Sequence, residues 1–143
     1  MRKRAFAFCL AVVMLLGATG MASAVEARAS HNLDDYSVAL TAEGGGVMSI
    51  TAVVNGVGEQ DKIGVRQIDI EYKTSLNGDW EYYDSLYAAE YPELYAYGNR
   101  TFMGGVDFNG EVGHYYRVTI TAYAKKGTLS DTGYVTSTGV RCK

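Results

Sequence analysis

Hydrophobic and polar residues alternate along several short stretches of the chain, most clearly in residues 65–74 and 114–125. A period of two places one face of a β-strand in the core and the other face in water. Both stretches are therefore predicted to be half-buried strands. The residues predicted to point inward are Ile68, Ile70 and Tyr72 in the first and Tyr116, Val118, Ile120 and Ala122 in the second.

Weaker runs of the same kind complete the pattern, and no amphipathic helical stretch of convincing length accompanies them. They cover residues 36–41, 47–54, 80–85, part of 97–108, and 133–140. Asn and Gly residues that tolerate positive φ separate several of them, and a turn at Asn55-Gly56 followed by a polar loop over 57–62 is predicted. About seven short antiparallel strands predict an all-β domain, most simply a β-sandwich, with a closed barrel as the alternative.

The first 24 residues have the three parts of a secretory signal peptide. Arg2, Lys3 and Arg4 are cationic, residues 5–16 are almost wholly apolar, and Ala22-Ser23-Ala24 is a small-x-small cleavage pattern. The apolar run is shorter than the roughly 20 residues that span a bilayer, so stable membrane insertion is not expected. The chain is predicted to be secreted, or periplasmic in a host with an outer membrane. Residues 25–35 are predicted to be a flexible lead and 36–143 the folded domain.

Charge and cysteine content argue against two classes of protein, those that bind nucleic acid and those held together by disulfides. The whole chain has a formal net charge of −3, and cleavage after Ala24 removes three basic and no acidic residues, which leaves −6. A mildly acidic protein is not expected to bind nucleic acid. Cys9 leaves with the signal peptide, so Cys142 has no partner within the chain and a disulfide framework is excluded. Cys142 is predicted to be a dispensable tail residue, with a link between chains as the alternative.

Two segments resemble fibronectin type III and related immunoglobulin-like sandwiches. Residues 116–122 look like that family's Tyr-x-Val-x-Val-x-Ala strand, and residues 68–73 with 77–80 look like its third strand, turn and following strand. The resemblance implies that Tyr116 is a tyrosine-corner residue whose hydroxyl bonds to the backbone a few residues upstream. The chain departs from the family in lacking a core Trp in its second strand and in having a single Pro. Its layout is also similar to small secreted proteins of Gram-positive bacteria.

The sequence offers little catalytic chemistry. The two histidines, His31 and His114, are far apart, and no Gly-x-Ser-x-Gly or His-Glu-x-x-His pattern occurs. No metal, cofactor or catalytic residue is therefore predicted, and the protein is not expected to be an enzyme. A pair of carboxylates for glycoside hydrolysis, drawn from Asp84, Glu90 and Glu93, stays open as an alternative because such pairs are set in three dimensions.

The most unusual stretch is residues 81–97, which holds half of the twelve tyrosines. Tyrosine has a rigid apolar ring with a polar tip, which suits contacts with proteins and sugars. The predicted binding residues are Tyr82, Tyr83, Tyr87, Tyr91, Tyr95 and Tyr97, of which three recur every four residues and would align on a helical turn. The alternative is that these rings pack over the edge of the domain.

The predicted function is thus a secreted, non-catalytic β-sandwich domain that binds or spaces an extracellular protein or glycan. A small secreted carbohydrate-active hydrolase and a structural surface protein that self-associates through strand edges are the alternatives.

Overall fold

The protein is all-β and antiparallel in a computed structural model that describes residues 24–27 and 30–143. The predicted signal peptide, Ala24 apart, lies outside these residues. The strands are β1 (Ala24–Ala27), β2 (Leu33–Gly44), β3 (Val47–Lys73), β4 (Glu81–Tyr87), β5 (Tyr95–Asn109), β6 (Tyr115–Lys126), β7 (Leu129–Thr136) and β8 (Val140–Arg141). One short 3₁₀ helix, η1 (Pro92–Leu94), precedes β5. Within the described residues, no helix is long and apolar enough to cross a membrane.

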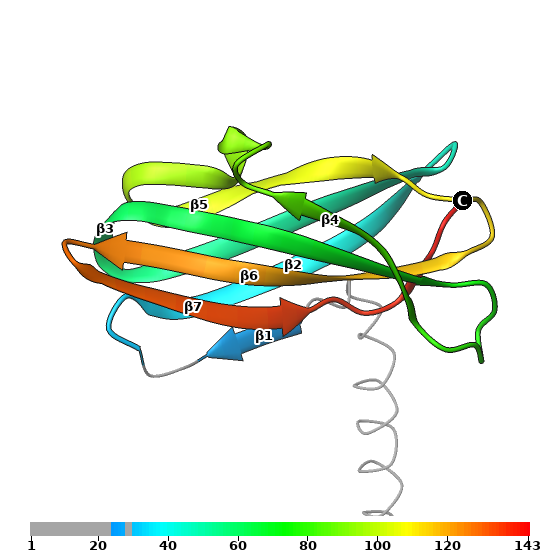
Figure 1. Cartoon of the computed structure of the whole chain (residues 1–143), viewed down its shortest axis with the longest axis horizontal. Helices are drawn as coiled ribbons and strands as arrows, with labels where there is room; N and C mark the ends of the chain where they lie inside the picture. The colour runs from blue at the N-terminus through cyan, green and yellow to red at the C-terminus, as the bar shows by residue number, and fades with distance from the viewer. Residues whose placement is uncertain (1–23, 28–29) are drawn as a thin grey trace, which may run out of the picture.

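All eight strands belong to one sheet that curls into a half-barrel (Figure 1). The main path of the sheet is β1-β2-β3-β6-β7, while β4 and β5 pair with β3, and β8 pairs with β6. The long strand β3 is the centre of this arrangement. Its first half lies between β2 and β5, and its second half lies between β6 on one side and β4 and the start of β5 on the other.

The alternation seen in the sequence defines the core. In β6, Tyr116, Val118, Ile120 and Ala122 are all fully buried, as predicted. Ile120 and Val118 are paired with Ile68 and Ile70 of β3. The first half of β3 buries one face in the same way, through Met48, Ile50, Ala52 and Val54. The inward face of the curled sheet is therefore the hydrophobic core, and the opposite face carries the partly exposed Arg117, Thr119 and Tyr123.

The curl brings the two ends of the sheet together. β2 contacts β6 and β7 although it pairs with neither. The buried Tyr36 of β2 packs directly on Gly133 of β7, where a Cβ atom would overlap the tyrosine ring. The missing side chain at Gly133 thus leaves the room that the Tyr36 ring occupies inside the half-barrel.

Two predictions about chain segments are wrong in the structure. β3 does not turn at Asn55-Gly56, and residues 57–62 are not a loop, because the strand runs through both. The pairing with β5 slips between Asn55 and Gln60, so that residues 56–59 bulge opposite a single residue of β5. The predicted flexible lead also contributes to the sheet, since β1 pairs with residues 35–38 and Leu33 begins β2 as a buried residue. The bulge bends β3 and lets one strand serve both ends of the molecule.

The C-terminus is part of the core, which corrects the expectation for Cys142. The Cys142 thiol is free and only 1% exposed, beside Gly110 and the Tyr116 ring. Its backbone N–H donates to the His114 carbonyl at 2.8 Å, and its carbonyl accepts from Gly113 at 3.0 Å. Cys142 is therefore neither a dispensable tail residue nor accessible for a link between folded chains.

The hydroxyl of Tyr116 makes the kind of bond that the resemblance implies. The backbone N–H of Glu111, five residues upstream, donates to the Tyr116 oxygen at 2.7 Å. The bond ties the loop before β6 to the core.

Candidate functional site

The six predicted tyrosines do not share one environment. Tyr82, Tyr83 and Tyr87 lie on β4, Tyr91 precedes η1, and Tyr95 and Tyr97 begin β5. Four of them, Tyr82, Tyr83, Tyr87 and Tyr97, are exposed, whereas Tyr91 and Tyr95 are half-buried against the core. The expected helical alignment does not occur, because the only helical turn between β4 and β5 is the three-residue η1.

Tyr83 has a structural role. Its ring lies 5.2 Å from Tyr116 and 6.1 Å from Phe108, measured between ring centroids. Its hydroxyl donates to the Asn109 carbonyl at 2.8 Å, which ties β4 to the end of β5. Tyr83 therefore fits the alternative interpretation, in which rings pack over the edge of the domain.

Three of the other tyrosines line a cavity of about 360 Å³. Tyr87 is the last residue of β4, and Tyr95 and Tyr97 lie at the start of β5, so the cavity lies where η1 connects the two strands. Ala88, Ala89 and Pro92 complete its apolar wall, and Lys62 and Arg66 of β3 add two cationic side chains. Tyr82, Tyr83 and Tyr91 do not line this cavity.

The strand register explains how these residues meet. Lys62 is paired with Tyr97, Gly64 with Tyr95, and Gln67 with Tyr87, so the register places this part of β3 directly beside the tyrosines of β4 and β5. Gly64 has φ +153°, and a Cβ atom there would overlap the Leu94 carbonyl oxygen. Glycine at this position therefore allows η1 to lie close against β3.

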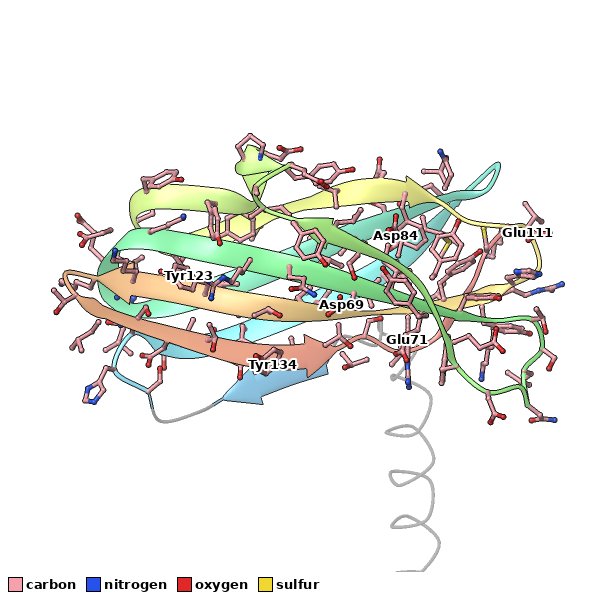
Figure 2. All side chains as sticks on the ribbon, in the orientation of Figure 1. Asp69, Glu71, Asp84, Glu111, Tyr123 and Tyr134 are labelled. Carbon is pink, nitrogen blue, oxygen red and sulfur yellow. The ribbon has the colours of Figure 1, made fainter. Side chains whose placement is uncertain are left out.

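Tyr123 of β6 extends the aromatic surface beyond the cavity. It is also paired with Gly64, and its ring meets that of Tyr95 edge to face at 6.0 Å across the glycine. Figure 2 shows Tyr123, Asp69 and Tyr134 along β6, β3 and β7. Two rows from the glycine, Tyr87, Gln67, Thr121 and Tyr134 are paired in turn across β4, β3, β6 and β7.

The two cations are held by these rings. The Lys62 Nζ lies 4.0 Å from the centroid of Tyr95, and the Arg66 guanidinium carbon lies 5.3 Å from that of Tyr123. Arg66 occupies a one-residue bulge, since Val65 and Gln67 pair with consecutive residues of β6. Bulges of this kind redirect a side chain. Neither cation has an ion-pair partner among the described residues, so both charges are available to a ligand.

The Tyr95 hydroxyl stays protonated over a wider pH range than a free tyrosine. Burial raises the pKa of Tyr95 above its ordinary value of 10.0, and Tyr123 and Tyr97 act in the same direction, against the lowering effect of Arg66. At neutral pH the cavity therefore presents a neutral phenol beside two positive charges.

The carboxylates considered for hydrolysis do not form a site in this cavity. Asp84, Glu90 and Glu93 are all exposed, and none of them lines it. Asp69 of β3 is paired with Ser85 of β4, and its carboxylate accepts hydrogen bonds from Gln67 at 2.7 Å and Ser85 at 2.6 Å. Within residues 24–27 and 30–143, no group of three or more His, Cys, Asp or Glu side chains is placed to hold a metal ion.

Sequence reasoning found the tyrosines but missed Lys62, Arg66 and Tyr123. Lys62 falls within the polar loop predicted over residues 57–62, which the structure shows as part of β3, and Arg66 carries no local signal. Only the antiparallel pairing of β3 with its neighbours brings these residues close to the predicted tyrosines. The sequence itself shows only that Lys62 and Arg66 lie two residues on either side of Gly64.

Comparison with known proteins adds no assignment. No known protein family matches the chain, and the search of curated proteins finds no similar sequence.

Proposed function

We propose that this chain is an exported, non-catalytic binding module, and that it contacts its extracellular partner through the cavity formed by Tyr87, Tyr95 and Tyr97. The observation that carries the proposal is the coincidence of three tyrosines and two unpaired cations around one cavity of about 360 Å³. Small-molecule sites are concave, mostly apolar and furnished with a few directed polar groups, and this cavity has that composition.

The exposure of the rings supports a contact role. Tyr97 is 65% exposed and Tyr87 is 45% exposed, so both have apolar area to bury against a partner. Aromatic rings dominate the energetics of such contacts because each buries a large area at little cost in conformational entropy. The cavity wall has no carboxylate, which favours binding over the hydrolase alternative.

We extend the proposal to the fold, as an immunoglobulin-like sandwich of the fibronectin type III kind. Two features support it. β2 lies against β6 and β7 without pairing with them, which is how two layers of a sandwich meet. The Tyr116 hydroxyl also bonds to the backbone a few residues upstream, at the Glu111 N–H, as in a tyrosine corner.

The test uses the secreted chain on an array of extracellular glycans and on insoluble polysaccharides. Tyr87→Ala with Tyr97→Ala should abolish whatever binding the native chain shows, with little change in melting temperature because both rings are exposed. Tyr91 and Tyr95 are unsuitable for this purpose, since they pack against the core.

Tyr134→Ala is the matched control, because Tyr134 is 57% exposed but does not line the cavity. Unchanged binding by the double variant, or equal loss in the control, would show that the cavity is not the contact surface. Self-association through Cys142 is the less supported alternative, since its thiol is buried.

A further inference from the structure

The chemistry of the cavity identifies a class of ligand, and this inference rests on the function proposed above. We propose that the cavity binds an acidic saccharide, a sugar ring that carries a carboxylate or a sulfate group. The sugar ring would lie against the tyrosines, and its acidic group would be bound by Lys62 and Arg66.

The charge of the site supports an anionic ligand. The whole chain is acidic, at −3, yet the cavity wall has two cationic side chains and no carboxylate. Within the described residues no acidic side chain forms an ion pair with either cation. An arginine guanidinium matches the planar edge of a carboxylate or a sulfate through two parallel hydrogen bonds, and a lysine adds a compact charge with three donors.

The positions of the cations matter as much as their charge. Lys62 lies over the ring of Tyr95, and Arg66 lies over the ring of Tyr123, so each positive head group is held against an aromatic face. A ligand that places an anion at the cations therefore brings its remaining atoms next to Tyr87 and Tyr97, which line the same cavity. The faces of a pyranose ring present C–H groups that pack on aromatic rings, and its hydroxyls can bond to phenols such as that of Tyr95.

The size of the cavity restricts the ligand further. A volume of about 360 Å³ lies at the low end of the range for small-molecule sites, which fits one or two sugar rings rather than a folded partner. Two cations are also few for a nucleic acid, whose binding depends on neutralising many phosphates. The observations therefore favour a saccharide over a polynucleotide.

The experiment is a heteronuclear NMR titration of the whole secreted chain with five probes. These are a tetragalacturonate, a sulfated carrageenan tetrasaccharide that has no carboxylate, the neutral maltotetraose, AMP, and a glutamate tetrapeptide. We expect at least one acidic saccharide to shift the amide signals of the cavity residues and to bind at least about tenfold more tightly than maltotetraose. Its affinity should fall with added salt because the contact is ionic. The two acidic sugars distinguish a carboxylate from a sulfate.

The variants are Lys62→Gln and Arg66→Gln, with Arg100→Gln as the charge-matched control. Arg100 is exposed on β5 and does not line the cavity. Each cavity variant should weaken binding of the acidic saccharide by about tenfold. The Arg100→Gln control should bind it as tightly as the native chain does. Circular dichroism and melting temperature establish that all variants are folded.

Three results would overturn the inference. The first is equal binding of the neutral sugar, the second is tighter binding of AMP or the peptide, and the third is no shift at the cavity with any acidic sugar. Each leaves the proposed function standing if Tyr87→Ala with Tyr97→Ala still abolishes binding on the array. Loss of that tyrosine dependence would instead contradict the proposed function itself.

Discussion

Gly64 is the residue whose substitution tests the geometry of the site most directly. Its φ of +153° is unfavourable for a residue with a side chain, and the Cβ of an alanine would overlap the Leu94 carbonyl oxygen and lie 3.0 Å from the Tyr95 Cα. The neighbours are backbone atoms, which cannot rotate away. Gly64→Ala should therefore combine backbone strain with steric overlap and reduce the free energy of unfolding by about 2–6 kcal/mol.

Two other glycines separate these contributions. Gly98 has φ +62° with open space where a Cβ would be, so Gly98→Ala should show the backbone term alone, about 1–2 kcal/mol. Gly105 has no positive φ, but its Cβ would overlap the Ile50 carbonyl oxygen, so Gly105→Ala should show overlap alone, about 1–3 kcal/mol. Gly64→Ala should exceed Gly98→Ala, because it adds overlap to the same kind of backbone strain.

The assay is equilibrium unfolding in urea, followed by circular dichroism, for the native chain and the three variants. Domains of this size are stable by about 5–15 kcal/mol, so the expected losses are readily measured. A Gly64→Ala variant as stable as Gly98→Ala would refute the close approach of η1 to β3, and with it the shape of the cavity.

Three further outcomes are expected. Tyr116→Phe should lower the free energy of unfolding by about 0.5–1.5 kcal/mol, because the Glu111 N–H loses its partner while the ring still fills the core; a larger loss in urea unfolding would contradict this. Cys142 should react with a thiol reagent only after denaturation, since its thiol is buried, and fast labelling of the native chain would show otherwise. The pKa values of Tyr72, Tyr95 and Tyr116 are all raised, by the Glu81 hydrogen bond for Tyr72 and by burial for the other two, so folding favours their protonated forms. The contribution of these tyrosines to stability should be fully present below about pH 10 and should be lost as the pH rises through their raised pKa values. A urea midpoint that rises over that pH range would contradict this sign.

An element of the fold could be predicted from the sequence where local residues determine it, and could not where residues distant along the chain determine it. The inward faces of β3 and β6 followed from local alternation, because a residue such as Val118 or Ile68 must avoid water whatever its partner. The continuity of β3 did not, because Asn55-Gly56 suits a turn and a bulge equally well. Pairing with β5, which is distant along the chain, selects the bulge.

The candidate site shows the same division. Tyrosine density marked residues 81–97, but it could not separate Tyr83, which is bonded into the fold, from Tyr97, which is open to solvent. The sequence could not predict that Lys62 and Arg66 belong to the site, because their position beside the tyrosines depends on strand register and on the bulge at Arg66. Local sequence reports which side chains suit a contact, whereas the tertiary pairing determines which of them meet.

The unbroken course of β3 has a consequence for how the molecule opens. Strands cover both of its edges near each end, so neither end can separate without disrupting hydrogen bonds that run along the same 27-residue strand. Amides in residues 47–54 and 63–72 should therefore exchange with solvent deuterium at one common, slow rate set by global unfolding. An insertion at the bulge of residues 56–59 should divide that rate into two, while the same insertion at the Lys126-Gly127 turn should not.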